Sequence, residues 1–230
     1  MDPASKGDPA EDRAKPVHVY KFLDSQFGLK SLYERRLKIA RVEELNDPFE
    51  LTPYNLKDPV DRVAFQRTRR RLGERFGMVC FSATCTDPVL WAHYSDKHRG
   101  ICLGFEIAGN HWREVEYVRD RLPFPDDFFK LNAVARLGVA TDMIFTKYEN
   151  WNYESEIRTW APLDHEEDGL FFCDFDENLK LTQVLVGARC TLPKAAIARA
   201  LGRFANGIEL TKVRAAFQTF QIVTDLRGFK

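Results

Sequence analysis

Two glutamates separated by one residue are the feature of this sequence that most strongly suggests chemistry. Glu154 and Glu156 lie within residues 151–158, a stretch that also holds a tryptophan, a tyrosine and Arg158. In a β-strand, residues two apart point to the same face, so both carboxylates and the guanidinium of Arg158 would lie together. Neighbouring carboxylates repel, which raises the pKa of one of them and suits acid–base catalysis. A polar strand face neutralised by Arg158 is the alternative, and the aromatic neighbours favour a pocket wall.

A second group of polar side chains occupies residues 90–100. It contains His93, Tyr94, His98 and Arg99, and it directly precedes an apolar run. On a helix, His93 and Tyr94 would each neighbour the leucine that opens the segment, because residues three and four apart are adjacent. A single histidine is usually an ordinary core or surface residue. The density of polar groups here indicates a binding site instead.

Two further candidates sit on predicted strands. Ser82 ends the apolar run at residues 78–82, where its hydroxyl is able to reach a ligand; an ordinary turn serine is the competing interpretation. A Ser82–His93 hydrolase pair is conceivable, but no GxSxG turn surrounds the serine. His18 and Tyr20 share one face of the first strand, and Tyr20 offers a ring for stacking and a phenol for hydrogen bonding. Core packing is the alternative for this pair.

The hydrophobic pattern predicts the elements that must position these residues. Strands are expected at residues 17–22, 37–40, 78–82, 100–106, 114–118, 153–161, 179–186 and within 210–223. Helices are expected at residues 25–36, 59–76, 88–94, 128–139 and 193–205. Helices and strands do not alternate regularly, and several strands are consecutive. The pattern therefore predicts an α+β fold with mixed or antiparallel split sheets and peripheral helices.

The predicted helix at residues 59–76 is unusually rich in arginine. Its arginines are Arg62, Arg67, Arg69, Arg70, Arg71 and Arg75. An ordinary solvated helix face accounts for them. A surface that contacts phosphates or nucleic acid is the sharper interpretation.

Length and composition limit the classes of protein. A chain of 230 residues fits one large domain, and we expect it at residues 17–230 after a polar, proline-containing flexible leader at residues 1–16. The chain has 34 Lys+Arg and 34 Asp+Glu, so its formal net charge is zero. Proteins that bind nucleic acid chiefly through phosphates usually carry a basic excess, so only a local basic patch remains open.

The sequence also predicts a cytoplasmic protein with no membrane partner. It has no run of about 20 apolar residues and no apolar signal-peptide core. The five cysteines include no CxxC pair, so reduced thiols are expected. A zinc site built from Cys80, Cys85, His93 and His98 would have an unusual spacing, and we predict no metal site.

Several of these segments, taken in order, resemble the bacterial family called domain of unknown function 2971. The matching blocks are Tyr20-Lys21-Phe22, LNDPFE at residues 45–50, Cys80-Phe81-Ser82, LWAHY at residues 90–94, HRGICLGF at residues 98–105 and WNYESEIR at residues 151–158. The resemblance spans residues 17–223. The chain departs from the family at Leu23, where an arginine often stands, which puts any anion contact there in doubt.

A weaker similarity is to the ADP-ribosyltransferases. Those enzymes are similar in having a first strand that bears His, Arg or Tyr, a later strand that bears Ser or Tyr, and a late strand with Glu-x-Glu. The similarity implies an ADP-ribosyltransferase-like fold. It also implies NAD as the cosubstrate, cleavage of the nicotinamide–ribose bond, and transfer of ADP-ribose to an unknown protein or nucleic-acid acceptor.

Mapped onto this chain, the similarity implies a role for each candidate. Glu156 would stabilise the cationic sugar and hold a ribose hydroxyl, while Glu154 would orient or deprotonate the acceptor. The implied NAD-binding residues are His18, Tyr20, Ser82, His93, Tyr94 and Arg99. Among them, Tyr20 or Tyr94 would stack on nicotinamide, and His93 with Arg99 would bind the pyrophosphate.

Two other functions remain open from the residues alone. One is a hydrolase or nuclease that uses His93, His98 and the two glutamates, with or without a metal. The other is a non-catalytic module that binds nucleic acid through the arginine-rich helix.

Overall fold

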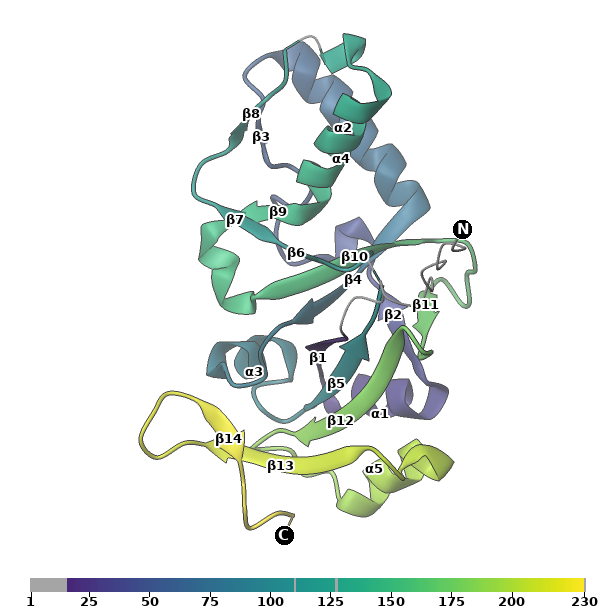
Figure 1. Cartoon of the computed structure of the whole chain (residues 1–230), viewed down its shortest axis with the longest axis vertical. Coiled ribbons are helices and arrows are strands. Elements are labelled where there is room, and N and C mark those ends of the chain that lie inside the picture. The colour runs from purple at the N-terminus through teal and green to yellow at the C-terminus, as the bar shows by residue number, and fades with distance from the viewer. Residues whose placement is uncertain (1–15, 110, 127, 230) are drawn as a thin grey trace, which may run out of the picture.

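The centre of the fold is an eight-stranded mixed sheet with the order β14-β13-β12-β5-β1-β4-β10-β6 (Figure 1). The computed structural model describes residues 16–109, 111–126 and 128–229, so residues 1–15 of the predicted leader lie outside the described residues. The strands of this sheet are β1 (Val17–Leu23), β4 (Phe76–Ser82), β5 (Ile101–Ile107), β6 (Arg113–Glu114), β10 (Glu156–Pro162), β12 (Leu179–Val186), β13 (Glu209–Ala215) and β14 (Ile222–Thr224).

One pair of neighbouring strands in this sheet is parallel. Neighbouring strands are antiparallel except β12 and β13, which run parallel. A parallel pair needs a crossover, and helix α5 (Lys194–Leu201) supplies it. The α+β class and the mixed sheet expected from the sequence are confirmed.

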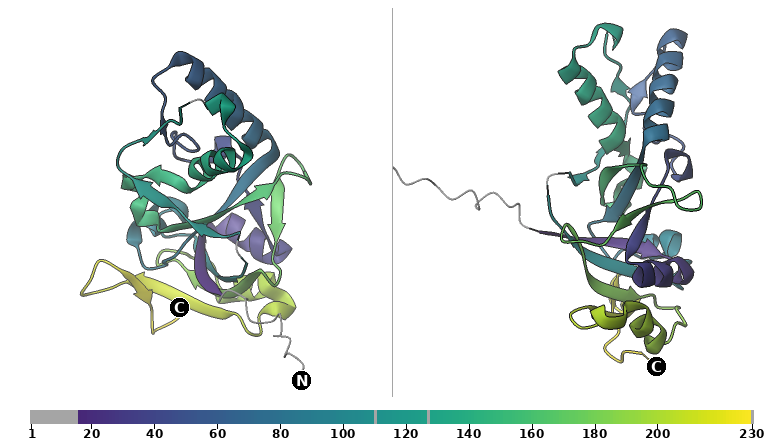
Figure 2. Two further views of the ribbon diagram at one scale, coloured as in Figure 1. Left: turned by 45° about the horizontal axis from the view of Figure 1, so that its top comes forward. Right: turned by 90° about the vertical axis from the view of Figure 1, so that its right-hand side faces the viewer.

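Smaller elements flank the sheet. Three two-stranded pairs join β2 (Arg36–Ile39) with β11 (Phe171–Asp174), β3 (Tyr54–Asn55) with β8 (Leu122–Pro123), and β7 (Glu116–Val118) with β9 (Thr146–Tyr148). The other α-helices are α1 (Ser25–Glu34), α2 (Pro59–Arg75), α3 (Pro88–Tyr94) and α4 (Ala133–Phe145). Short 3₁₀ helices are η1 (Val42–Glu44), η2 (Phe128–Lys130), η3 (Glu149–Glu154) and η4 (Gly202–Phe204). Helices α2 and α4 project together beyond the sheet (Figure 2).

Aspartate followed by proline begins two of the helices, as the sequence predicts for α3. The carboxylates of Asp58 and Asp87 accept hydrogen bonds from the backbone N–H groups of Val60 and Val89, each at 2.7 Å. Proline follows at the first helical position, where its missing N–H costs nothing. Helix α3 then buries Trp91, whose indole N–H donates to the Cys85 carbonyl in the preceding loop at 2.7 Å. The indole ring packs edge-on against Phe22 of β1, which fixes the helix against the sheet.

The buried apolar residues of the described chain form three cores, one of which packs α3 against the sheet. The core under the sheet is packed around Val19, Phe105 and Val184, from β1, β5 and β12. A separate core joins α2 and α4 through Phe65 and Met143. This core also includes Met78 of β4, so α2 and α4 form a helical lobe packed onto one end of the sheet.

Three predicted elements have different limits in the structure. The predicted strand at 153–161 begins only at Glu156, because residues 149–154 form η3 and Ser155 takes a left-handed conformation with φ of 43°. The predicted strand at 114–118 is divided between β6 and β7, which belong to different sheets. The predicted helix at 128–139 is displaced to α4, because the side chain of Asn132 caps the N–H of Ala135 at 2.9 Å.

Two glycines give a matched test of this packing. A Cβ on Gly100 would collide with the carbonyl oxygen of Leu23 and lie 2.9 Å from the Cα of Asp24, and backbone has no room to move aside. Gly138 lies exposed within α4 with nothing near its Cβ position. We expect Gly100→Ala to lower the free energy of unfolding by about 3 kcal/mol, and Gly138→Ala to raise it by about 0.5–1 kcal/mol. Urea unfolding measures both, and equal effects would contradict the packing described.

Candidate functional site

Three residues predicted for the site form one row across three neighbouring strands. Tyr20 of β1 pairs with Ser82 of β4, and Ser82 pairs in turn with Glu156 of β10. Directly opposed residues point to the same face of a sheet, so the three side chains lie side by side. All three line one pocket with a volume of about 240 Å³.

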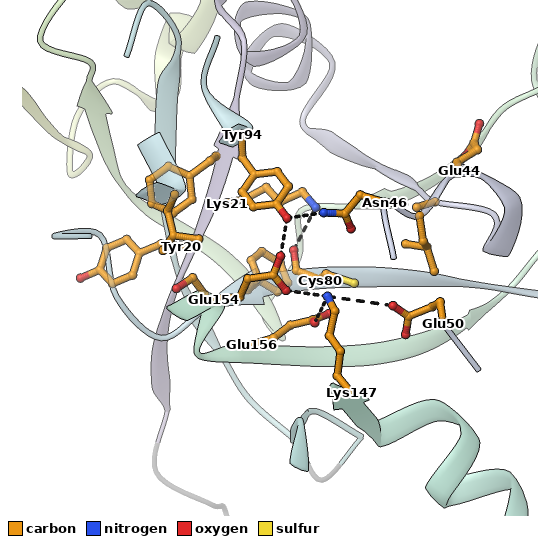
Figure 3. Close-up of a pocket in the computed structure, with 16 residues that line it drawn as sticks. Tyr20, Lys21, Glu44, Asn46, Glu50, Cys80, Tyr94, Lys147, Glu154 and Glu156 are labelled. Carbon is orange, nitrogen blue, oxygen red and sulfur yellow. Dashed lines mark hydrogen bonds and ion pairs between the residues drawn. The ribbon is translucent and has the colours of Figure 1, made fainter. Parts of the chain in front are cut away.

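The rest of the pocket wall comes from segments far apart in the chain (Figure 3). Its polar members, besides the row, are Lys21, Glu44, Asn46, Glu50, Tyr94, Lys147 and Glu154. They come from β1, the η1 region, α3, β9 and η3. The pocket therefore opens where the sheet meets the segments that lead into the helical lobe.

Lys147 is the centre of a buried ionic cluster in this pocket. Its ammonium lies 2.5 Å from Glu154 Oε2, 3.2 Å from Glu156 Oε2 and 4.0 Å from Glu50 Oε2 (Figure 3). Burial by itself would lower the pKa of Lys147, but the three carboxylates raise it overall. Lys147 is therefore held as a cation.

Arg158 completes the cluster from behind the pocket. It is fully buried, forms an ion pair with Glu50, and lies 3.7 Å from Glu156 Oε1. Burial raises the pKa of Glu50. Burial acts the same way on Glu156, but the cations Arg158 and Lys147 outweigh it and hold the pKa of Glu156 below its ordinary value. Glu156 is thus held as a carboxylate anion.

Glu154 is occupied on both oxygens. Oε1 accepts a hydrogen bond from the Tyr94 hydroxyl, and Oε2 pairs with Lys147. The Tyr94 hydroxyl in turn accepts a hydrogen bond from Asn46 at 2.5 Å. Burial and the neighbouring Glu154 both raise the pKa of Tyr94. A carboxylate with both oxygens engaged holds its neighbours in place and is poorly suited to accept a proton from an acceptor.

Glu154 and Glu156 come together in a way that the sequence analysis did not predict. Glu154 belongs to η3 and is not a strand neighbour of Glu156, so the expected strand face shared with Arg158 is wrong for Glu154. The left-handed Ser155 between them turns the chain, and both carboxylates reach the same ammonium. The backbone N–H of Glu156 donates to the Tyr117 hydroxyl at 2.9 Å, which fixes the start of β10.

Three predicted NAD-binding residues do not line the pocket. His18 is 63% exposed and faces Glu106 at 3.8 Å, two residues along β1 from Tyr20. His93 is exposed, and its Nδ1 lies 3.2 Å from the hydroxyl of Tyr153. Successive residues of a helix point in different directions, so His93 points away from the pocket that Tyr94 enters. Arg99 lies in the loop before β5, exposed. Its guanidinium faces Asp96 at 3.7 Å, outside the pocket.

The sequence analysis missed several pocket residues. Lys147 stands between Thr146 and Tyr148 in a three-residue strand, and no pattern identifies it. Asn46 and Glu50 fall in the LNDPFE block, for which the sequence predicts no site residue. Lys21 alternates with Tyr20 on β1, yet its ammonium reaches the pocket and donates to the Cys80 carbonyl at 2.9 Å. Such a lysine retains N–H groups for a ligand.

The glycine opposite Tyr20 on β5 leaves room for the tyrosine ring. This partner is Gly104, and a Cβ there would lie 3.4 Å from the tyrosine ring and 3.0 Å from Gln183 Cβ. Burial and the nearby Cys85 thiol raise the pKa of Tyr20 to about 12. Tyr20 is therefore a neutral phenol at physiological pH.

Comparisons with family models, with curated proteins and with solved structures find no match to this chain. Within the part of the chain that the structure describes, no group of three His, Cys, Asp or Glu side chains is arranged to hold a metal ion. In the same residues, no helix is both long and apolar enough to cross a membrane.

Proposed function

We propose that this protein is an ADP-ribosyltransferase-like enzyme that cleaves the bond between nicotinamide and ribose in NAD. The observation that carries the proposal is the row of Tyr20, Ser82 and Glu156 on adjacent strands in one pocket. An aromatic ring, a hydroxyl and an ionised carboxylate in line match the three tasks of this reaction. These are stacking a pyridinium ring, holding a sugar, and stabilising a sugar cation.

The charge of the pocket suits this substrate. The charged side chains on its wall are four glutamates and two lysines, so carboxylates are in excess. The nicotinamide ring of NAD is a cation, and positive charge passes to the ribose as the bond breaks. A carboxylate in a buried site stabilises such charge more strongly than it would in water.

In the proposed reaction the bond from ribose C1′ to the pyridinium nitrogen breaks, and its electron pair stays on that nitrogen. Neutral nicotinamide leaves, and the acceptor attacks C1′ and releases a proton. Glu156 faces the sugar cation, Ser82 donates to the sugar or the amide, and Tyr20 stacks on the ring. Because both Glu154 oxygens are engaged, we assign Glu154 to positioning and leave the released proton to solvent.

The size of the pocket indicates how NAD would lie. Pockets that enclose whole drug-sized ligands measure about 300–1,000 Å³. A volume of about 240 Å³ fits the nicotinamide and its ribose, with the pyrophosphate at the rim. Lys21 takes the pyrophosphate role expected for His93 and Arg99, because its ammonium lies on the pocket wall.

Binding of NAD is the first test. At about one hundred times its dissociation constant, NAD should add about 2.7 kcal/mol to the free energy of unfolding. Tyr20→Ala should weaken NAD binding about tenfold, since stacking on an aromatic ring contributes about 1–3 kcal/mol. Tyr20→Phe keeps the ring and serves as the control. Thermal shift and nicotinamide release measure these effects, and the absence of any stabilisation by NAD would contradict the proposal.

A further inference from the structure

The outward face of helix α2 carries arginines that the site does not use. Arg67, Arg71 and Arg75 follow one another at intervals of four residues, so they form one stripe along the helix. All three are exposed. Among residues 16–109, 111–126 and 128–229, none of their side chains makes an ion pair or a hydrogen bond, although the Arg75 guanidinium packs over the ring of Phe76.

The side chains of the other arginines of α2 each have a partner. Arg69 donates to the carbonyl of Glu50 at 3.1 Å, and Arg62 donates to that of Lys57 at 3.1 Å. Arg70 lies 3.5 Å from Glu74. The helix thus satisfies the arginines on its flanks and leaves the outward stripe without partners in the described chain.

Folding alone does not explain the stripe. Like charges four residues apart destabilise a helix, and within the stripe only Arg75, in the last turn, is placed favourably for the helix dipole. All six basic residues of α2 are arginine and none is lysine. Lysine carries the more strongly hydrated cation, whereas the planar guanidinium of arginine binds phosphate through two parallel hydrogen bonds. The choice of arginine points to a phosphate-bearing partner.

The residue content and shape of the α2–α4 lobe favour duplex DNA as this partner. Single-stranded nucleic acids are bound by stacking bases on aromatic side chains, but the one aromatic residue of α2, Phe65, is buried. The α2–α4 lobe projects from the sheet (Figure 2), and the major groove of B-DNA admits a helix. The major groove of duplex RNA is too deep and narrow for such contacts.

We propose that α2 lies in the major groove of duplex DNA with the Arg67–Arg71–Arg75 stripe on the phosphates that line the groove, so that binding is independent of base sequence. The chain has no net charge, so binding depends on this local stripe. The inference does not require NAD cleavage, because the stripe lies outside the pocket.

Fluorescence anisotropy with a short labelled DNA duplex tests the proposal. If three phosphates are neutralised, the plot of log affinity against log salt should have a slope of about −2.7. Replacing all three arginines by glutamine should weaken binding about tenfold or more at low salt and flatten the slope toward zero. Replacing all three by lysine should cause a smaller loss, because charge is kept while the paired hydrogen bonds are lost.

The matched control is the triple variant Lys194→Gln, Arg199→Gln, Arg203→Gln, which removes the same charge from exposed positions on and after α5. It should bind the duplex as the wild type does. The proposal is overturned if the α2 triple binds normally, if the control loses as much, or if the wild type prefers single-stranded DNA or duplex RNA. Glu156→Gln should bind duplex normally, which separates this proposal from the proposed NAD cleavage.

Discussion

Replacing Glu156 by glutamine should slow nicotinamide release from NAD by a factor of about 10²–10³, the usual cost of removing one group that stabilises transition-state charge. The amide keeps the size and hydrogen-bonding reach of the carboxylate but has no negative charge. NAD binding should change much less, because the sugar becomes cationic only as the bond breaks. The expected result is therefore a fall in kcat with a nearly constant KM.

The cluster around Glu156 allows this variant to fold. Three carboxylates face two cations there, so removing one negative charge balances the cluster. Glu114→Gln is the control, because Glu114 is an exposed carboxylate on β6, directly beside β10. A folded Glu156→Gln protein that releases nicotinamide at the wild-type rate would remove the role assigned to this carboxylate.

Lys147→Met should lower the free energy of unfolding by about 3–5 kcal/mol, the cost of breaking a buried ion pair from one side. Methionine fills similar space, but it leaves Glu50, Glu154 and Glu156 buried with Arg158 as the remaining cation of the cluster. Urea unfolding measures the loss. The slope of the free energy of unfolding against urea concentration should stay unchanged, because the same surface is exposed on unfolding.

A second substitution separates charge from packing in this experiment. Lys147→Met combined with Glu154→Gln should recover part of the lost stability, because one of the unpaired carboxylates is removed with the ammonium. Lys30→Met provides the control. Lys30 forms an exposed pair with Glu34, and its loss should cost less than about 1 kcal/mol. A Lys147→Met protein as stable as this control would show that the cluster contributes little.

Local patterns were sufficient for most elements of the fold. The strand at Val17–Leu23, the helix at Pro59–Arg75 and the Asp-Pro start of α3 all depend on residues close in sequence. The register that aligns Tyr20, Ser82 and Glu156 is different, because it joins residues more than sixty positions apart. Hydrophobic alternation gives the face of each strand but not its partner, so this row had to come from the structure.

The errors at the site have the same physical origin. His93 and Tyr94 are adjacent in sequence, and only the orientation of α3 decides which one enters the pocket. Lys147 is recognisable only by the three carboxylates that surround it, and these come from three other segments of the chain. The turn at Ser155 requires a left-handed residue, which serine adopts rarely, so the sequence there indicated a continuous strand.

The helical lobe and the sheet meet through charges as well as apolar side chains. In the chain, Glu50 directly precedes Leu51 of the lobe core, and Lys147 lies two residues after the end of α4. Glu156 directly precedes Ile157 of the core under the sheet. Apolar surfaces tolerate small sliding movements, but hydrogen-bonded ion pairs have narrow optimal distances and directions. The buried ion-pair cluster therefore fixes how the helical lobe is aligned on the sheet. Because it is buried, dissolved salt screens it only weakly.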